Sequence, residues 1–350
     1  MADLQTNYLG LELKNPVIVG ASNLTLKTEN LQKIEKAGAA AVVYKSLFEE
    51  QVHLENLELH EMRTEYEERN AEMVTLFPDS KSDLSYPGYH LLNLKRAKET
   101  LSIPVIASLN AVYDESWVEY ALKIEETGVD AIELNFYTVP EKKEKEYGEI
   151  EQKQIKILNA VKSAVKIPVS VKLSPYYTNP VRLISDLDKQ GVDGFVLFNR
   201  LFQPDIDIYE QTHRFPYNLS NPEDKRLPLR FAGLLYGNIR ASLCANSGIF
   251  NGEDVVKLLL AGADCVQIVS TVYLNQIDVI GKILLEIGEW MDSNKYNSIG
   301  EFRGKLSRKN SGNETPFNRT QYIDFQMRTK EILKKYRAIH SCRVKKHSCH

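Results

Sequence analysis

Short apolar runs recur along the whole chain, at spacings that suit a repeated structural unit. Eight of them cover residues 16–22, 40–46, 104–110, 131–135, 168–174, 194–199, 241–247 and 265–271. Each run is a nearly continuous stretch of Val, Ile, Leu, Ala and Cys, with little alternation of apolar and polar residues. Strands that are buried on both faces have this pattern, so we expect eight buried β-strands.

Segments with the apolar spacing of helices lie between most of these runs. They cover residues 115–127, 151–164, 180–190, 253–261 and 276–291. Strands that alternate with helices indicate a parallel sheet. Three runs open with a proline, which is tolerated at the first position of a strand, and four follow a glycine of the kind that ends helices. Eight such units close a barrel, so the sequence predicts an α/β fold, the (β/α)8 TIM barrel.

Two long stretches interrupt this pattern. Residues 47–94 form a charged, partly helical excursion after the second run, and residues 200–226 form a polar loop after the sixth. Long loops in compact domains are usually lids, binding loops or interfaces, so the first excursion is expected to cover the barrel mouth or to join two copies in a homodimer. We expect residues 1–296 to form the barrel and residues 297–350 a polar segment with a helix at 317–336 and disordered last residues.

Composition narrows the classes of partner. The chain has 350 residues, 43% of them hydrophobic, and a net charge of −3, which gives no general attraction to nucleic acid or anionic lipid. We find no secretion signal and no membrane-spanning run, so no membrane partner is expected. Four cysteines without a disulfide spacing favour a reducing, cytoplasmic compartment. No metal site is expected, because the terminal residues match no zinc pattern: His340, Cys342, His347, Cys349 and His350.

Polar residues stand where the apolar runs end. They are Ser22, Lys45, Ser46, Asn110, Asn135, Lys172, Ser174, Asn199, Ser247 and Ser270. In a barrel of parallel strands these ends meet at one mouth, which is the face where barrel enzymes keep their chemistry. Each asparagine alone could merely cap a turn, but their shared face favours contact with a ligand.

The last two turns between strand and helix have the features of an anion site. Ser247-Gly248 ends the seventh run, and Val269-Ser270 falls in the eighth, each just ahead of a helix. Backbone N–H groups at paired turns and helix starts bind phosphate where small residues allow a close approach. Gly248 alone would be explained by a tight turn, but two adjacent turns favour a phosphate.

Two lysines lie within apolar strands. Lys45 and Lys172 either extend their charged ends to solvent or meet an anion or acceptor, because a lysine inside an apolar strand is otherwise costly. A binding role is the interpretation that we favour for both. Lys172 could also form a Schiff base, as lysines on barrel strands sometimes do.

The motifs together resemble the dihydroorotate dehydrogenase family, in its soluble class, over residues 8 to about 306. The matching segments, in order, are LGLELKNPVIVGAS, VVYKSLFEEQ, AIELN, VKLSPYYT, VLFNR, SGIFNGEDVVKLLLAGADCVQIVSTVY and IGEFRGKL. The resemblance implies a flavin mononucleotide (FMN) cofactor, oxidation of a dihydropyrimidine-like small molecule at a CH–CH bond, and a place in pyrimidine biosynthesis.

The resemblance also assigns the residues that hold FMN. It places them at Ala21, Ser22, Lys45, Ser46, Asn110, Asn135, Lys172, Asn199, Ser247, Gly248, Val269 and Ser270. Lys172 would lie near the pyrimidine edge of the flavin and stabilise the negative charge of its reduced form. Lys45 would orient flavin and substrate. The family has glycines at the positions of Ser247 and Val269, and backbone donation survives both changes.

The substrate side departs from the family pattern. The family loop after the fourth strand reads Asn-x-x-Cys-Pro-Asn, or Ser for Cys, where the Cys or Ser is the catalytic base. Here Thr138 stands at the base and Pro140 replaces the last asparagine, which leaves no side-chain donor. A threonine hydroxyl needs an adjacent acceptor to act as a base. Arg200 replaces a small hydroxyl residue after Asn199.

Three functions remain open at this point. The first is an FMN-dependent CH–CH oxidoreductase in which Thr138 is the proton acceptor and Lys45 orients flavin and substrate. The second is a flavin-binding protein that has lost turnover and acts as a binding or partner subunit. The third is a flavin-free barrel, an aldolase or isomerase that relies on Lys172.

Overall fold

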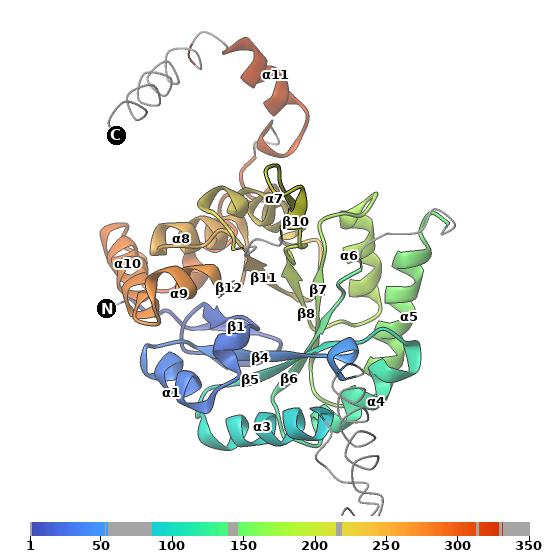
Figure 1. Ribbon diagram of the computed structural model, residues 1–350. Helices are drawn as coiled ribbons and strands as arrows, with labels where there is room; N and C mark the ends of the chain where they lie inside the picture. Colours follow the sequence, from blue (N-terminus) through green and yellow to red (C-terminus); the bar gives the residue numbers. More distant parts are fainter. Residues whose placement is uncertain are drawn as a thin grey trace, which may run out of the picture.

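Eight parallel strands form a closed barrel at the centre of the molecule. The computed structural model describes residues 2–52, 54, 86–138, 146–214, 219–312, 315–328 and 331. The strands are β3 (Val17–Val19), β4 (Ala41–Phe48), β5 (Val105–Asn110), β6 (Ala131–Asn135), β7 (Val169–Leu173), β8 (Gly194–Leu197), β11 (Ser242–Asn246) and β12 (Cys265–Ile268). They pair in the order β11-β12-β3-β4-β5-β6-β7-β8 and close on themselves (Figure 1). The predicted (β/α)8 barrel is confirmed.

Helices surround this barrel on the outside (Figure 1). They are α1 (Thr28–Lys36), α3 (Tyr86–Thr100), α4 (Asp114–Glu125), α5 (Glu149–Ala164), α6 (Pro180–Lys189), α7 (Arg226–Leu235), α8 (Gly252–Ala261), α9 (Ser270–Asn275) and α10 (Val279–Ser293). The eighth apolar run is part strand and part helix, because α9 begins at Ser270. The proposed end of the first excursion at residue 94 falls inside α3, and residues 55–85 lie outside the described residues.

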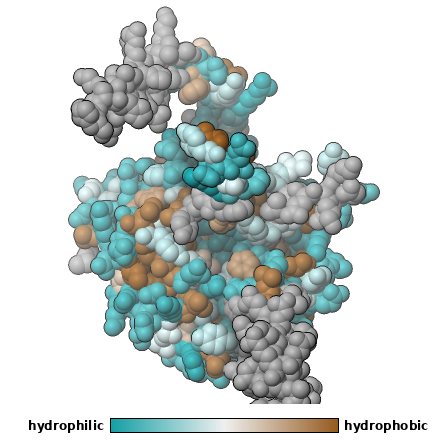
Figure 2. Space-filling view, in the orientation of Figure 1, coloured by the Kyte–Doolittle hydropathy of each residue, from teal (hydrophilic) through white to brown (hydrophobic). Residues whose placement is uncertain are grey.

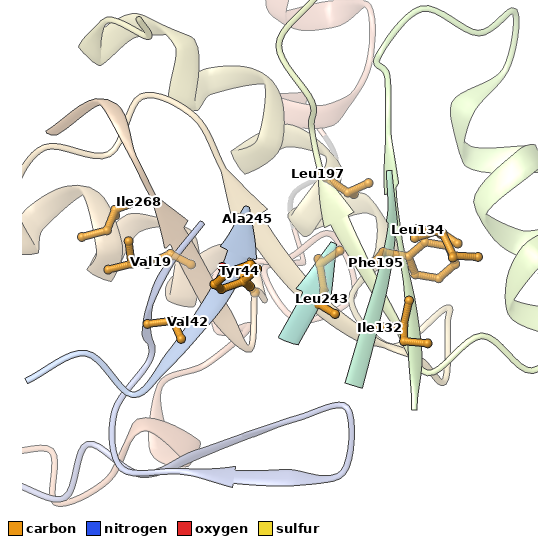
Figure 3. Close-up of a cluster of buried hydrophobic side chains, with 14 of the residues drawn as sticks. Val19, Val42, Tyr44, Ile132, Leu134, Phe195, Leu197, Leu243, Ala245 and Ile268 are labelled. Carbon is orange, nitrogen blue, oxygen red and sulfur yellow. The ribbon is translucent and has the colours of Figure 1, made fainter. Parts of the chain in front are cut away.

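The strand residues alternate between two hydrophobic layers. Residues that point outward pack against the helices; Figure 3 shows Val19, Val42, Tyr44, Ile132, Leu134, Phe195, Leu197, Leu243, Ala245 and Ile268 from this layer. Residues next to them in sequence fill the barrel interior, for example Ile18, Val43 and Val196. Successive side chains of a strand point to opposite faces. Because both faces of each strand are buried here, its residues are mostly apolar along the whole run.

A short hairpin covers the amino-terminal end of the barrel. It consists of β1 (Thr6–Tyr8) and β2 (Leu11–Leu13), with Leu9 and Gly10 at positive φ in the turn. Its side chains Tyr8, Leu9 and Leu13 pack with Ile18 in the interior layer. This end of the barrel is therefore filled by apolar side chains, and the opposite end, where the strands finish, carries the polar residues.

The second excursion and the carboxyl-terminal segment have some regular structure. Residues 200–226 contain an exposed hairpin of β9 (Asp205–Asp207) and β10 (Thr212–Arg214). Within the segment 317–336, where a helix is predicted, the structure describes the shorter helix α11 (Thr320–Met327). Residues 329–330 and 332–350, with the terminal His and Cys residues, lie outside the described residues. Among the described helices, none combines the length and the apolar character that a membrane crossing requires. Figure 2 shows mixed polar and apolar residues on the visible face of the molecule.

Candidate functional site

The twelve residues predicted to hold the cofactor all lie at the carboxyl-terminal end of the barrel. Ala21 and Ser22 follow β3, and Lys45 and Ser46 belong to β4. The other members are Asn110 at the end of β5, Asn135 at the end of β6, Lys172 in β7, Asn199 after β8, Ser247 and Gly248 after β11, and Val269 and Ser270 after β12. Because the strands are parallel, their ends surround one mouth.

A cavity of about 170 Å³ opens at this mouth between the ends of β3, β7, β8, β11 and β12. Seven of the predicted residues line it: Ala21, Lys172, Asn199, Ser247, Gly248, Val269 and Ser270. The other five are not among its lining residues: Ser22, Lys45, Ser46, Asn110 and Asn135. The structure thus brings the cation of β7 and both predicted phosphate turns to one hollow.

A hydrogen bond joins one of the remaining residues, Asn135, to the lining of the cavity, and another joins the neighbouring strands β4 and β5. Asn199 donates through Nδ2 to Asn135 Oδ1 at 2.5 Å, which links the ends of β8 and β6. Ser46 and Ser108 share a hydrogen bond of 2.6 Å between their hydroxyls. The β4–β5 register shifts between Tyr44 and Leu47, so Lys45 and Ser46 lie at an irregularity of the kind that redirects side chains.

A larger cavity of about 1130 Å³ adjoins the first. The two share the lining residues Asn199, Arg200, Asn246 and Ser247, so they are neighbouring compartments of one mouth. Arg200 lies at their junction and forms an ion pair with Asp224 in the second excursion. The mouth can therefore accept a ligand longer than the smaller compartment alone.

The two predicted phosphate turns lie close together. Gly248 N–H donates to Ser220 Oγ at 3.2 Å, and Ser220 N–H donates to Ser270 Oγ at 2.8 Å. A single residue of the second excursion thus bridges both turns. Sequence reasoning missed Ser220, because nothing in the polar loop showed which of its residues returns to the mouth.

The backbone at Ser247 and Gly248 explains why glycine suits both positions. Both residues have positive φ, 81° and 73°, in the region that favours glycine. A Cβ atom built on Gly248 would lie 2.2 Å from the backbone nitrogen of Lys225. Lys225 is held in turn by an ion pair of 3.0 Å with Asp254. Gly248 is therefore required both for its conformation and for the close approach of the second excursion.

Lys172 lies in a buried polar group below the mouth. Its Nζ donates to Gln267 Oε1 at 3.3 Å and is 3.6 Å from Glu133 Oε1, while Gln267 Nε2 donates to Glu133 Oε2 at 2.6 Å. The side chains of Glu133 and Gln267 were not predicted as site residues. A signal was present, because each interrupts an otherwise apolar run, Glu133 in AIELN and Gln267 in CVQIV.

Thr138 follows β6 at the edge of the mouth and is half-buried. The neighbouring Tyr137 accepts a hydrogen bond from Phe202 N–H at its hydroxyl, 2.7 Å away, which joins this loop to the second excursion. Pro140 lies outside the described residues. Thr138 is thus placed near the mouth but lines neither of the two cavities described above.

A buried histidine of α3, His90, packs against β4. His90 of α3 packs edge-on against Tyr44 with ring centroids 5.3 Å apart, and its pKa is lowered to about 4, first by burial and then by the charge of Lys45. Between pH 6.5 and 4 the unfolded chain therefore binds a proton that the folded protein does not, so stability falls as the pH drops. We expect about 2 kcal/mol of unfolding free energy to be lost from this group between pH 7 and pH 5.

The measurement is urea unfolding at both pH values for the wild-type protein and His90→Phe. Phenylalanine keeps the ring contact with Tyr44 and does not titrate. The pH-dependent loss should be smaller in the variant by about 2 kcal/mol. Equal losses in the two proteins would show that His90 takes up its proton in the folded state as readily as in the unfolded state.

The fold and the mouth define a (β/α)8 barrel protein with a polar cavity at the carboxyl ends of its strands. A family model described as dihydroorotate dehydrogenase matches residues 83–291. Three curated relatives are each named dihydroorotate dehydrogenase B (NAD(+)), catalytic subunit. The protein of Thermoplasma acidophilum is 30% identical over 88% of this chain and 100% of its own length. Those of Thermoplasma volcanium and Methanocaldococcus jannaschii are each 29% identical, over 87% and 81% of this chain and 98% and 92% of their own lengths.

The family model spans the barrel from α3 to α10, which includes the ends of β5, β6, β7, β8, β11 and β12. This chain belongs to the dihydroorotate dehydrogenase family.

Proposed function

We propose that this protein is an FMN-dependent oxidoreductase that acts on the CH–CH bond of a small cyclic amide, with dihydroorotate as the nominal substrate. The observation that carries the proposal is the convergence of Lys172, Asn199 and both small-residue turns on one cavity. Family membership supports the same chemistry. The proposal extends the activity in the relatives' names to this chain.

The residues at the mouth fit the parts of FMN. The turns at Ser247-Gly248 and Val269-Ser270 would hold the phosphate through backbone N–H groups. The Gly248 N–H donates to Ser220 Oγ, so an anion would have to replace that contact. Lys172 of β7 supplies a cation in the lining of the same cavity as these turns. When bound, the flavin supplies the ability to accept a hydride, which no side chain has.

The chain's own residues would position the substrate and take its proton. Oxidation of a CH–CH bond to C=C would remove a hydride and a proton from the substrate, and the proton would need a base on this chain. Thr138 Oγ1 is the candidate acceptor of that proton, and Lys45 and the linked amides of Asn135 and Asn199 would hold the ring. A proton acceptor placed in this way typically accelerates a reaction 10²–10⁴-fold, so the identity of the base decides turnover.

The first experiment adds FMN to the purified protein and then dihydroorotate without oxygen. We expect tight binding of FMN, an absorption band near 450 nm, and loss of that band when dihydroorotate reduces the flavin. Protein that binds no flavin would contradict the proposal and return attention to a flavin-free lyase or isomerase. The hydrogen bond of Lys172 to Gln267 and its proximity to Glu133 speak against that alternative, which needs a free amine.

A second candidate is a flavin-binding protein without turnover on dihydroorotate. The observation in its favour is Thr138, a hydroxyl residue with an added methyl group where the family pattern has Cys or Ser. This candidate predicts normal FMN binding and no bleaching by dihydroorotate. A screen of other cyclic amides and enones as reductants would then separate a changed substrate from a lost activity.

Thr138→Val tests the proposed base. Valine has nearly the same shape but no hydroxyl, so we expect reduction of the bound flavin by substrate to slow by about 10²–10³-fold while FMN affinity stays the same. Rapid-mixing absorbance at 450 nm measures the rate. Thr127→Val, at the end of α4 and away from the mouth, is the matched control and should keep the wild-type rate. An unchanged rate in Thr138→Val would assign the proton to another group.

We also infer that the protein works as part of an assembly. The relatives are named catalytic subunits, and the homodimer that the first excursion allows remains a prediction. Light scattering of the purified chain, alone and co-expressed with the neighbouring genes of its operon or locus, measures its mass in solution. A monomer in every case would contradict this inference and leave the oxidoreductase proposal unaffected.

A further inference from the structure

A charged and polar layer crosses the barrel interior directly below the mouth. It is made by Glu133 of β6, Lys172 of β7 and Gln267 of β12, whose residues are 1%, 7% and 1% exposed. β6 and β12 lie on opposite sides of the barrel in the strand order, so the three side chains reach across its axis. Below them the interior is filled by apolar residues that include Ile106, Ala131 and Val196.

The contacts within this layer leave Lys172 with unused donor capacity. Its ammonium has three N–H donors, and its two protein neighbours are Gln267 Oε1 at 3.3 Å and Glu133 Oε1 at 3.6 Å. Both distances exceed the 2.7–2.9 Å of a strong charge-assisted hydrogen bond. Glu133 Oε1 accepts no hydrogen bond from the described residues. Because Lys172 also lines the smaller cavity, at least one N–H is available to a ligand there.

The amide of Gln267 lies between Lys172 and Glu133 and bonds to both, and Gly20 lies close beside it. The amide accepts from Lys172 through one atom and donates to Glu133 through the other. Gly20, at the end of β3, allows this arrangement, since a Cβ atom there would lie 3.2 Å from Gln267 Oε1 and 2.9 Å from Val269 Cγ2. The amide therefore holds Lys172 and Glu133 at a set separation.

We propose that Glu133 is a positioning residue that, acting through Lys172, sets the reduction potential of the flavin bound at this mouth. The inference rests on the proposed function. The Lys172 ammonium favours the negative charge that flavin gains on reduction, and the Glu133 carboxylate cancels part of its field. In a buried setting such charges act strongly because water screens them little. Glu133 thus keeps the potential lower than Lys172 alone would make it.

The test compares the reduction potential of bound FMN in the wild-type protein and Glu133→Gln by titration against a reference dye. Glutamine keeps an acceptor oxygen of similar shape but has no charge. We expect reduced FMN to gain at least tenfold in affinity relative to oxidised FMN, which corresponds to a rise of about 30 mV for a two-electron couple. A residue with only a structural role would not raise the potential selectively.

Two further variants make the result decisive. Glu133→Asp keeps the charge and should keep the potential within a threefold change in the affinity ratio, whereas an equal shift in both variants would overturn the proposal. Glu119→Gln removes an exposed carboxylate of α4 and should leave the potential unchanged. A flavin-loaded Glu133→Gln protein with the wild-type potential defeats this inference alone, while a chain that takes up no FMN defeats the proposed function with it.

Discussion

Replacing Lys172 with methionine is expected to lower the free energy of unfolding by about 3–5 kcal/mol, because it leaves the Glu133 carboxylate buried without its counterion. Methionine has a similar length and fills the same space, so the effect reports the lost charge and not a cavity. Glu133 is 1% exposed and has only Gln267 as a hydrogen-bond donor among the described residues. Urea unfolding followed by circular dichroism on the protein without added flavin measures the loss.

The double variant Lys172→Met/Glu133→Gln is the decisive comparison. Removing both charges of a buried pair is far less costly than removing one, so most of the lost stability should return. Lys162→Met is the matched control, since Lys162 pairs with Asp193 at 2.6 Å on the solvent side of the barrel and should cost at most about 1 kcal/mol. If the double variant were as unstable as Lys172→Met, the stability would not depend on the charge pair.

The barrel could be predicted because its strands repeat one physical pattern. A strand buried on both faces has to be apolar along its whole length, and the run at 131–135 matches β6 residue for residue. The run at 265–271 was predicted too long. Its apolar character continues past Ile268, but the backbone turns into α9 at Ser270, and hydrophobicity alone does not distinguish a buried strand from the start of a buried helix.

The hairpin of β1 and β2 could not be predicted from the hydrophobic pattern. Each of its strands has three residues, too few for a periodicity to show. Its place is decided by contacts with distant residues: Thr6 Oγ1 donates to Asp264 O, and Leu9 N–H donates to Ser242 Oγ. Such contacts over more than 200 residues are fixed by closure of the barrel, which a local pattern does not describe.

Some residues of the candidate site could be predicted from the sequence and others could not. The strand ends could be predicted because each residue is polar where an apolar run stops, and parallel topology brings such positions together. Glu133 lies two residues before the strand end, inside the run. Its role could not be predicted without knowing which residue it contacts. That partner, Gln267, is 134 residues away on the far side of the barrel. Ser220 was missed because a loop position is set by the residues that it contacts.

The barrel interior has an apolar layer toward its amino-terminal end and a charged layer next to the mouth, and the two layers contribute differently to stability. Ile18, Val43 and Val196 fill space and stabilise the closed sheet. Glu133, Lys172 and Gln267 contribute less to stability than apolar residues of the same volume would, since burying charge is costly. Their presence in an interior that could be wholly apolar supports a role at the mouth above them.

Gly248→Ala is expected to cost about 3 kcal/mol or more of unfolding free energy and to abolish FMN binding. Two effects add at this position. An alanine at φ +73° is strained by about 1–2 kcal/mol, and its Cβ would lie 2.2 Å from Lys225 N and 2.9 Å from the carbonyl carbon of Asp224, so the turn at Pro222–Lys225 must move. The second excursion would then withdraw from the two predicted phosphate turns that Ser220 bridges. Urea unfolding and FMN fluorescence titration measure the two losses.

Gly128→Ala separates the two contributions. Gly128 follows α4 with a φ of +81°, nearly the same as at Gly248, but a Cβ atom there meets nothing within 4 Å. It should therefore show the conformational cost alone, about 1–2 kcal/mol, with normal flavin binding. The excess loss in Gly248→Ala then measures how tightly the second excursion is held against the anion site. Equal losses in the two variants, with FMN still bound by both, would mean that this contact is dispensable and that the turn binds phosphate without it.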